Sequence, residues 1–82
     1  MAGVLYEVFV IKVTDPSDDS VRYVQDYNVR SNMISFITVK DWAKSFMRLT
    51  DVEQALSEVR DISPKYKYEI DTYMDEFNPS LY

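Results

Sequence analysis

The chain has 82 residues, a formal net charge of −5, and 46% hydrophobic and 15% aromatic residues. So many apolar side chains are typical of a folded protein, and the length suits one domain, residues 1–82, with one core. The absence of cysteine and histidine excludes disulfides, thiolate chemistry, Ser-His nucleophile pairs and Cys/His zinc sites. We therefore expect a protein that is not an enzyme and that has no catalytic residue, cofactor or metal.

The distribution of charge and apolar residues limits the partners. No run approaches the roughly 18 apolar residues of a membrane span, and residues 1–20 have neither a basic start nor a small-residue cleavage site. We expect a soluble, cytoplasmic protein with no membrane partner. Residues 1–48 carry six acidic and six basic side chains, whereas residues 49–82 carry eight acidic and three basic ones. Because an acidic surface repels phosphates, nucleic acid is disfavoured as a partner.

Residues 4–13, VLYEVFVIKV, hold eight apolar or aromatic side chains in ten positions. With the period of two that a strand imposes, these side chains fall on both of its faces. A half-exposed strand would alternate with polar residues, whereas a strand buried in the middle of a sheet would not. The sequence therefore predicts a central strand that must be covered on each side.

Two further strands are expected after this one. Residues 14–20 are dense in Asp, Ser and Pro, which predicts a loop. Residues 21–29 alternate between apolar and polar side chains, with Val24 and Gln25 out of phase, and residues 33–39 are rich in β-branched and aromatic side chains. Both ranges are predicted as strands, joined by a short turn and antiparallel to their neighbours.

The hydrophobic period then changes from that of a strand to that of a helix. A short helix is predicted over residues 41–48, because its apolar side chains recur on one helical face: Trp42, Ala43, Phe46 and Met47. A second helix is predicted to begin at a capping box formed by Thr50 and Glu53 and to end before Pro64. Its expected buried stripe comprises Val52, Ala55, Leu56, Val59 and Ile62.

The last segment fits two periods. Residues 66–77 can be arranged with apolar side chains on one face of a strand or of a helix. The tyrosine, isoleucine and threonine side chains favour a strand over residues 66–73. A helical turn over residues 75–77 is left open, and Asn78-Pro79 is expected to stop any regular element.

The predicted order β-β-β-α-α-β indicates an α+β fold, with a small antiparallel sheet of strand order 3-2-1-4 and two helices packed on one face. This arrangement leaves the other face of the sheet uncovered by the chain itself. We therefore expect that face to meet a partner, most simply a second copy in a homodimer. The expected core comprises Leu5, Val8, Phe9, Val10, Ile11, Val24, Phe36, Trp42, Phe46, Leu56, Val59 and Ile70.

The acidic last third of the chain is the candidate binding surface. It combines carboxylates with tyrosine rings, and such a surface suits a basic protein, since opposite charge speeds encounter and the rings supply contact area. A basic nucleic-acid-binding protein is the expected kind of partner. An acidic face that only keeps the domain soluble is the alternative. The residues expected to bind are Glu58, Asp61, Glu69, Asp71, Tyr73, Asp75 and Glu76.

Other arrangements of side chains suggest other chemistry. A sheet that binds single-stranded nucleic acid would stack bases on two tyrosines beside two arginines: Tyr23, Tyr27, Arg22 and Arg30. The loop residues Asp15, Asp18 and Asp19 could hold a hard cation, but the glycine and glutamate of an EF-hand loop are missing. The carboxylates on the predicted strands lack the spacing of a metal-dependent nuclease.

Three stretches, LYEVFVIKVTDP, RYVQDYNV and the closing DEFNPSLY, resemble the short accessory proteins of phages and prophages of Gram-positive bacteria. The likeness lies in size, acidity, the lack of Cys and His, and the density of Tyr, Asp and Asn. It implies a non-enzymatic protein that acts by binding, such as an inhibitor of a host defence or nucleic-acid enzyme in the manner of the anti-CRISPR proteins. A structural accessory protein is equally implied.

Overall fold

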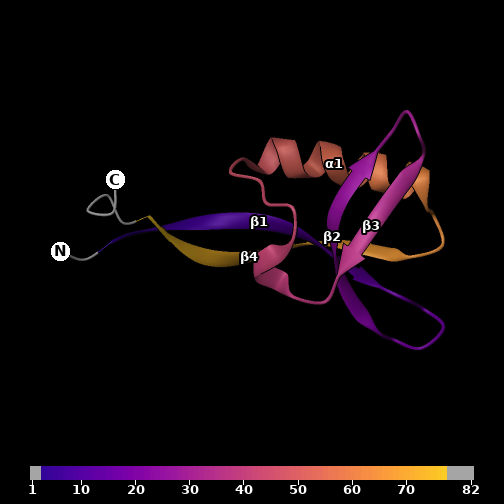
Figure 1. Ribbon diagram of the computed structural model, residues 1–82, viewed down its shortest axis with the longest axis horizontal. Helices are drawn as coiled ribbons and strands as arrows, with labels where there is room; N and C mark the ends of the chain where they lie inside the picture. Colours follow the sequence, from indigo (N-terminus) through magenta and orange to yellow (C-terminus); the bar gives the residue numbers. More distant parts are fainter. Residues whose placement is uncertain (1–2, 78–82) are drawn as a thin grey trace.

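A computed structural model describes residues 3–77 (Figure 1). Its elements are β1 (Val4–Thr14), β2 (Val21–Asn28), β3 (Met33–Ile37), the 3-10 helix η1 (Lys40–Trp42), α1 (Leu49–Ile62) and β4 (Lys67–Phe77). The strands form one antiparallel sheet with the order β3-β2-β1-β4. The α+β class and the strand order are confirmed. The prediction of two helices is wrong, because α1 is the one α-helix of the described residues.

The central strand β1 is paired unequally on its two sides. β4 pairs with it over eleven positions without a shift, from Val4 opposite Phe77 to Thr14 opposite Lys67. β2 pairs only with the last three residues of β1. The start of β1 and the end of β4 therefore leave the body as a two-stranded ribbon, which Figure 1 shows on the left. Since β4 continues to Phe77 as a strand, no helical turn forms over residues 75–77.

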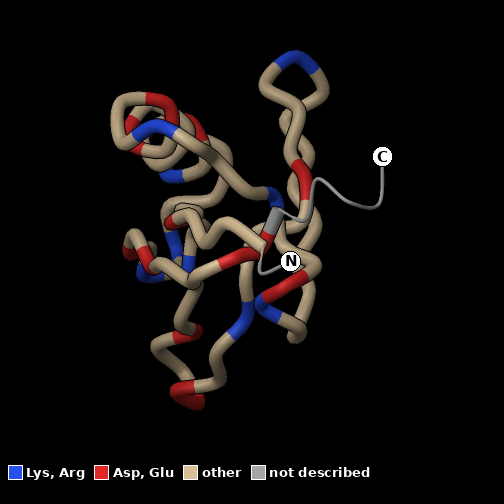
Figure 2. The backbone as a smooth tube through the Cα atoms, turned by 90° about the vertical axis from the view of Figure 1, so that its left-hand side faces the viewer, with Lys and Arg blue, Asp and Glu red and all other residues tan. Residues whose placement is uncertain are grey.

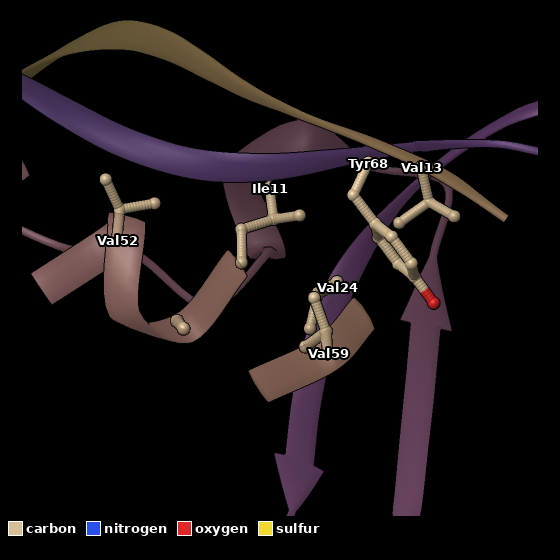
Figure 3. Close-up of a cluster of buried hydrophobic side chains, with 7 residues drawn as sticks. Ile11, Val13, Val24, Val52, Val59 and Tyr68 are labelled. Atoms are coloured by element: carbon tan, nitrogen blue, oxygen red, sulfur yellow. The ribbon is translucent and has the colours of Figure 1, made fainter. Parts of the chain in front are cut away.

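The main core lies between α1 and one face of the sheet. Ile11, Val13 and Val24 point from the sheet toward Val52 and Val59 of the helix, as Figure 3 shows. The helix brings Val52, Ala55 and Val59 to this side because residues three and four apart share a helical face. Tyr68 closes the end of the core, with its ring buried and its hydroxyl donating to the Ser63 carbonyl at 2.6 Å.

A bulge explains why the middle of β2 is out of phase in the sequence. Val24 lies opposite Phe36 and Asp26 lies opposite Ser35, so Gln25 is an extra residue on the β2 side. The bulge lets Val24 and Tyr27, three positions apart, both contact the helix-side core. Without it, the alternation of a regular strand would turn one of them to the other face.

The segment predicted as a helix over residues 41–48 is mostly extended. After η1, Ala43 has β-region dihedrals, Lys44 donates its amide to the Val24 carbonyl at 2.9 Å, and Phe46 bridges to Phe9 of β1. A helix of two turns is marginal by itself, whereas the extended path satisfies backbone groups against the sheet and packs Phe46 on the core. The path also carries the chain from η1, on one side of the sheet, to α1 on the other (Figure 1).

Part of the second face of the sheet is covered by the chain itself, contrary to our expectation. Val8 is 2% exposed and Val10 is 0% exposed, although both point away from α1. They share their face with Asp71, which pairs with Lys40 of η1 at 3.0 Å. The segment 40–43 thus covers this part of the sheet, and the uncovered face from which the homodimer was inferred does not exist at these positions.

Several smaller expectations also fail. Leu5 is 64% exposed and Trp42 is 71% exposed, so neither belongs to the core. α1 begins at Leu49 with Arg48 as N-cap and without a side-chain cap hydrogen bond, so Thr50 lies inside the first turn and forms no capping box. The remaining expected core residues are buried or pack against the buried cluster. The expected stop at Asn78-Pro79 lies outside the described residues.

Candidate binding surface

The structure divides the seven predicted site residues among three places. Glu69, Asp71, Tyr73 and Asp75 alternate along β4 on the face opposite α1, whereas Glu76 lies on the helix-side face. Glu58 and Asp61 lie on α1 itself. Figure 2 shows the acidic positions spread over the helix, the loops and the strands. The sequence therefore predicted one acidic surface, whereas in the structure the acidic residues of β4 and those of α1 lie on separate surfaces.

Glu58 has a structural contact that the sequence did not suggest. Its carboxylate accepts a hydrogen bond from the Tyr27 hydroxyl, and desolvation followed by the Glu58 charge raises the pKa of Tyr27. The pair joins α1 to β2, so Glu58 is engaged within the fold. Asp61, in contrast, is exposed.

Three contacts order the acidic face of β4. Asp71 pairs with Lys40 at 3.0 Å, Glu69 pairs with Lys67 at 3.5 Å, and the Tyr6 hydroxyl donates to Asp75 at 3.2 Å. Partial desolvation raises the pKa of Asp71, but hydrogen bonds from Lys40 and the Thr72 amide outweigh it and lower that pKa. Desolvation and then the charges of Asp75 and Asp41 raise the pKa of Tyr73.

The hydrogen bonds of β1 decide which backbone groups of β4 point outward. The Phe9 amide donates to the Phe46 carbonyl at 2.9 Å, and the Phe46 amide donates to the Phe9 carbonyl at 2.8 Å. Both backbone groups of Phe9 thus point away from β4, so Phe9 and Thr72 are a non-hydrogen-bonded pair. By alternation, the outward backbone groups of β4 are those of Tyr68, Ile70, Thr72, Met74 and Glu76.

Side chains of the protein engage some of these outward groups. The Thr72 amide donates to Asp71 and the Glu76 amide donates to Asp75, each at 2.8 Å. The Arg60 guanidinium donates to the Tyr68 carbonyl at 3.4 Å. Ile70 and Met74 turn their amides and carbonyls to an edge where the described residues place no strand. The edge is therefore blocked by aspartates at the Thr72 and Glu76 amides and open at Ile70 and Met74.

Apart from its aspartates, β4 lacks the usual protection of an edge strand in its exposed part. Natural edge strands are commonly short, bulged, interrupted by proline, or lined with lysine. β4 has eleven residues in unbroken register, its one basic residue is Lys67 at its first position, and it contains no proline. From residue 70 to residue 76 it carries three acids and no base. The predicted strand order already placed this acidic strand at an edge of the sheet. Sequence reasoning missed its continuation from residue 73 to Phe77 and the direction of its outward backbone groups.

The alternative nucleic-acid platform is not assembled by the fold. Tyr23 lies opposite Ile37 and Tyr27 lies opposite Ile34, and the bulge between them puts the two tyrosines on opposite faces of the sheet. Arg30 lies in the turn between β2 and β3. An open hollow of about 310 Å³ flanks this hairpin and is lined by Asp26, Tyr27, Asn28, Ser31, Met33, Ile34 and Ser35. None of the residues that line this hollow is basic.

Among residues 3–77, no group of three or more acidic side chains lies close enough together to hold a metal ion. In the loop after β1, Asp15 instead accepts from the Ser17 amide and hydroxyl, and Asp18 accepts from the Ser20 amide at 2.9 Å. These hydrogen bonds lower the pKa of Asp15 and of Asp18. The loop carboxylates therefore hold the turn.

Within the described range, no helix combines the length and the apolar composition needed to cross a membrane. Comparisons with protein-family models, with curated proteins and with solved structures found no match.

Proposed function

We propose that the protein is a non-enzymatic binding module that holds a basic protein through β4. The observation that carries the proposal is a long, regular, acidic strand at the edge of the sheet, paired with β1 on one side and with no strand on its outer side among residues 3–77. Such an edge offers backbone hydrogen bonds to another chain, and its charge selects for positive side chains. The partner surface comprises Glu69, Asp71, Tyr73, Asp75 and Glu76.

The helix residues have a smaller place in this proposal than the sequence suggested. Glu58 is engaged with Tyr27 inside the fold, and Asp61 lies on a separate element. The homodimer also loses its original support, because Val8 and Val10 are buried without a second copy. A different, basic protein is thus the partner that fits the β4 surface better than a second copy.

A finer version follows the resemblance to phage accessory proteins. In that version the basic partner is a host defence or nucleic-acid-processing protein, and the acidic residues of β4 occupy the groove that otherwise binds phosphates. The alternation of Glu69, Asp71 and Asp75 along one face supports it, because the carboxylates follow an extended line as backbone phosphates do. Competition between this protein and DNA for a basic protein would test that version.

The test of the general proposal uses a fluorescent probe peptide, acetyl-Val-Lys-Val-Lys-Val-Lys-Val-amide, and measures its binding by anisotropy. At about 0.05 M salt the protein should bind the peptide, and raising the salt to about 0.5 M should release it, because screening weakens exposed charge pairs. The double variant Asp75→Lys/Glu76→Lys should bind at least about tenfold more weakly.

The matched control reverses two exposed charges on the first turns of α1, Asp51→Lys/Glu53→Lys, which changes the net charge by the same amount. This control should bind the probe peptide nearly as well as the unaltered protein. Equal losses in the two double variants would show that only overall charge matters. That result, or no binding at low salt, would contradict the proposed role of β4.

A further inference from the structure

The free edge of β4 has a defined pattern of hydrogen-bonding groups. Its outward residues are those on the helix-side face, and Ile70 and Met74 present an amide and a carbonyl each with no strand beside them in residues 3–77. Thr72, between them, presents an outward carbonyl, while its amide is held by Asp71. An added strand would pair with these three positions.

The two faces of β4 differ in chemistry, and this difference limits what could be added. On the face opposite α1, Glu69, Asp71 and Asp75 carry negative charge beside Tyr73. On the helix-side face, Ile70 is half-buried and Met74 is 58% exposed. Directly opposite residues of neighbouring strands share a face. A strand that matches both faces therefore alternates basic and apolar side chains.

We infer that the basic partner contributes an extended segment that adds to β4 as a fifth, antiparallel strand, with basic residues opposite Asp71 and Asp75 and apolar residues opposite Ile70 and Met74. This inference deepens the proposed function and rests on it. Antiparallel addition continues the arrangement of every other pair in the sheet. Main-chain hydrogen bonds supply affinity in this mode, and the alternating side chains supply specificity.

A second copy of this chain fits the edge poorly. In an antiparallel pair of two β4 strands related by a two-fold axis at residue 70, 71, 72 or 73, at least one pair of carboxylates lies directly opposite. An axis at residue 74 avoids this, but it pairs Thr72 with Glu76, and the amides of both are held by aspartates. Like charges opposite one another destabilise a strand pair. The charge of the edge thus favours a basic segment over self-association.

The aspartates give the edge a means of discriminating between partners. Asp75 blocks the Glu76 amide, and Asp71 blocks the Thr72 amide while also pairing with Lys40. A lysine or arginine opposite each aspartate draws its carboxylate away from the amide and leaves the amide free to donate to the new strand. A neutral segment has no charge that attracts the carboxylates. The aspartates therefore keep their hydrogen bonds to these amides, and the amides cannot donate to that segment.

The experiment compares the probe peptide with two forms that have the same charge and the same number of N-methyl groups. In the antiparallel arrangement, the outward positions of β4 face the valines of the peptide, so the valine amides point toward β4 and the lysine amides point away. In each form three backbone amides are methylated, either all at valines or all at lysines. Each set lies along one edge of the peptide strand, so methylation removes the hydrogen-bond donors of that edge only. The valine positions to be methylated are 3, 5 and 7, and the lysine positions are 2, 4 and 6.

Methylation at valine should weaken binding at least about tenfold relative to methylation at lysine, because only the former removes hydrogen bonds to β4. In the complex with the unmodified peptide, the Ile70 and Met74 amides should exchange with solvent at least about tenfold more slowly. This measurement needs no substitution in the protein.

The possible failures are distinguishable. If both methylated peptides bind as tightly as the unmodified one, strand addition is wrong and the acidic surface alone binds. If methylation at lysine is the more damaging change, the antiparallel arrangement is wrong. If the unmodified peptide does not bind at low salt, the proposed function fails and this inference with it.

Discussion

The two halves of the β1–β4 pair differ in their surroundings, although register and strand type are the same throughout. In the inner half, Val8, Val10, Ile11 and Val13 are at most 3% exposed, with α1 on one face and segment 40–43 on the other. In the outer half, Val4 is 60% exposed and Leu5 is 64% exposed. An apolar strand residue is therefore buried only where another element reaches it.

The largest expected difference between the halves concerns two aliphatic residues on the same face of β1. Ile11→Ala should lower the free energy of unfolding by about 2–5 kcal/mol, since it leaves a cavity under α1, whereas Leu5→Ala should lower it by less than about 0.5 kcal/mol. Urea unfolding followed by circular dichroism measures both values. Similar losses would mean that the outer half is also packed.

The opposite face of β1 offers a second comparison. Val10→Ala should lower the free energy of unfolding by about 2 kcal/mol, because it removes two buried methyl groups beneath segment 40–43, and Val4→Ala should have little effect. The unfolding midpoint should not change over a tenfold range of protein concentration, since the chain itself covers Val10. A midpoint that rises with concentration would instead favour the homodimer.

The inner half should also set the alkaline limit of stability. Desolvation raises the pKa of Tyr68 above 10, the value of an unhindered phenol. A group whose folded pKa is raised stabilises the protein below its unfolded pKa, so this stability is lost as the pH rises above about 10. Tyr68→Phe should lower stability by about 1 kcal/mol at pH 7 through loss of the hydrogen bond to Ser63, and it should flatten the decline above pH 10. An unchanged alkaline limb in the variant would contradict this assignment.

The strand β1 shows how far the sequence could predict this fold. Its apolar residues on both faces predicted a central position, which fixed the strand order once β2 and β4 were placed beside it. The same pattern could not show what covers each face, because Trp42 to Met47 fit a helical period as well as the extended crossing that forms. Hydrogen bonds between Phe46 and Phe9, 37 positions apart in the chain, decide that conformation.

The candidate site shows the corresponding limit for function. Acidic and tyrosine content pointed to the last third of the chain, and four of the seven residues do share one face of β4. The sequence could not separate these residues from Glu58, whose carboxylate reaches Tyr27 through the packing of α1 on β2. The predicted strand order placed β4 at an edge, but the sequence could not show which of its backbone groups point outward, because the direction of the Ile70 and Met74 amides follows from the bridge between Phe9 and Phe46.

The smallest expected effect concerns the ion pair between Lys40 and Asp71 on the second face of the inner half. The Lys40 and Asp71 side chains are about one-third exposed, so Asp71→Asn should lower stability at pH 7 by no more than about 1 kcal/mol. The pKa of Asp71 is lowered in the folded protein, so its contribution is present above pH 3.8 and is lost as the pH falls through the folded value. The variant should therefore lose less stability than the unaltered protein between pH 5 and pH 2.

Glu69→Gln is the matched control for this ion pair, because the Lys67 and Glu69 side chains are 71% and 48% exposed and solvent screens their attraction. It should leave the stability at pH 7 unchanged within error. An equal effect of the two substitutions would show that Lys40 is not held against the sheet. The element η1 would then pack only loosely over Val8 and Val10. In that case segment 40–43 would stabilise the second face of the inner half less than its position in the structure indicates.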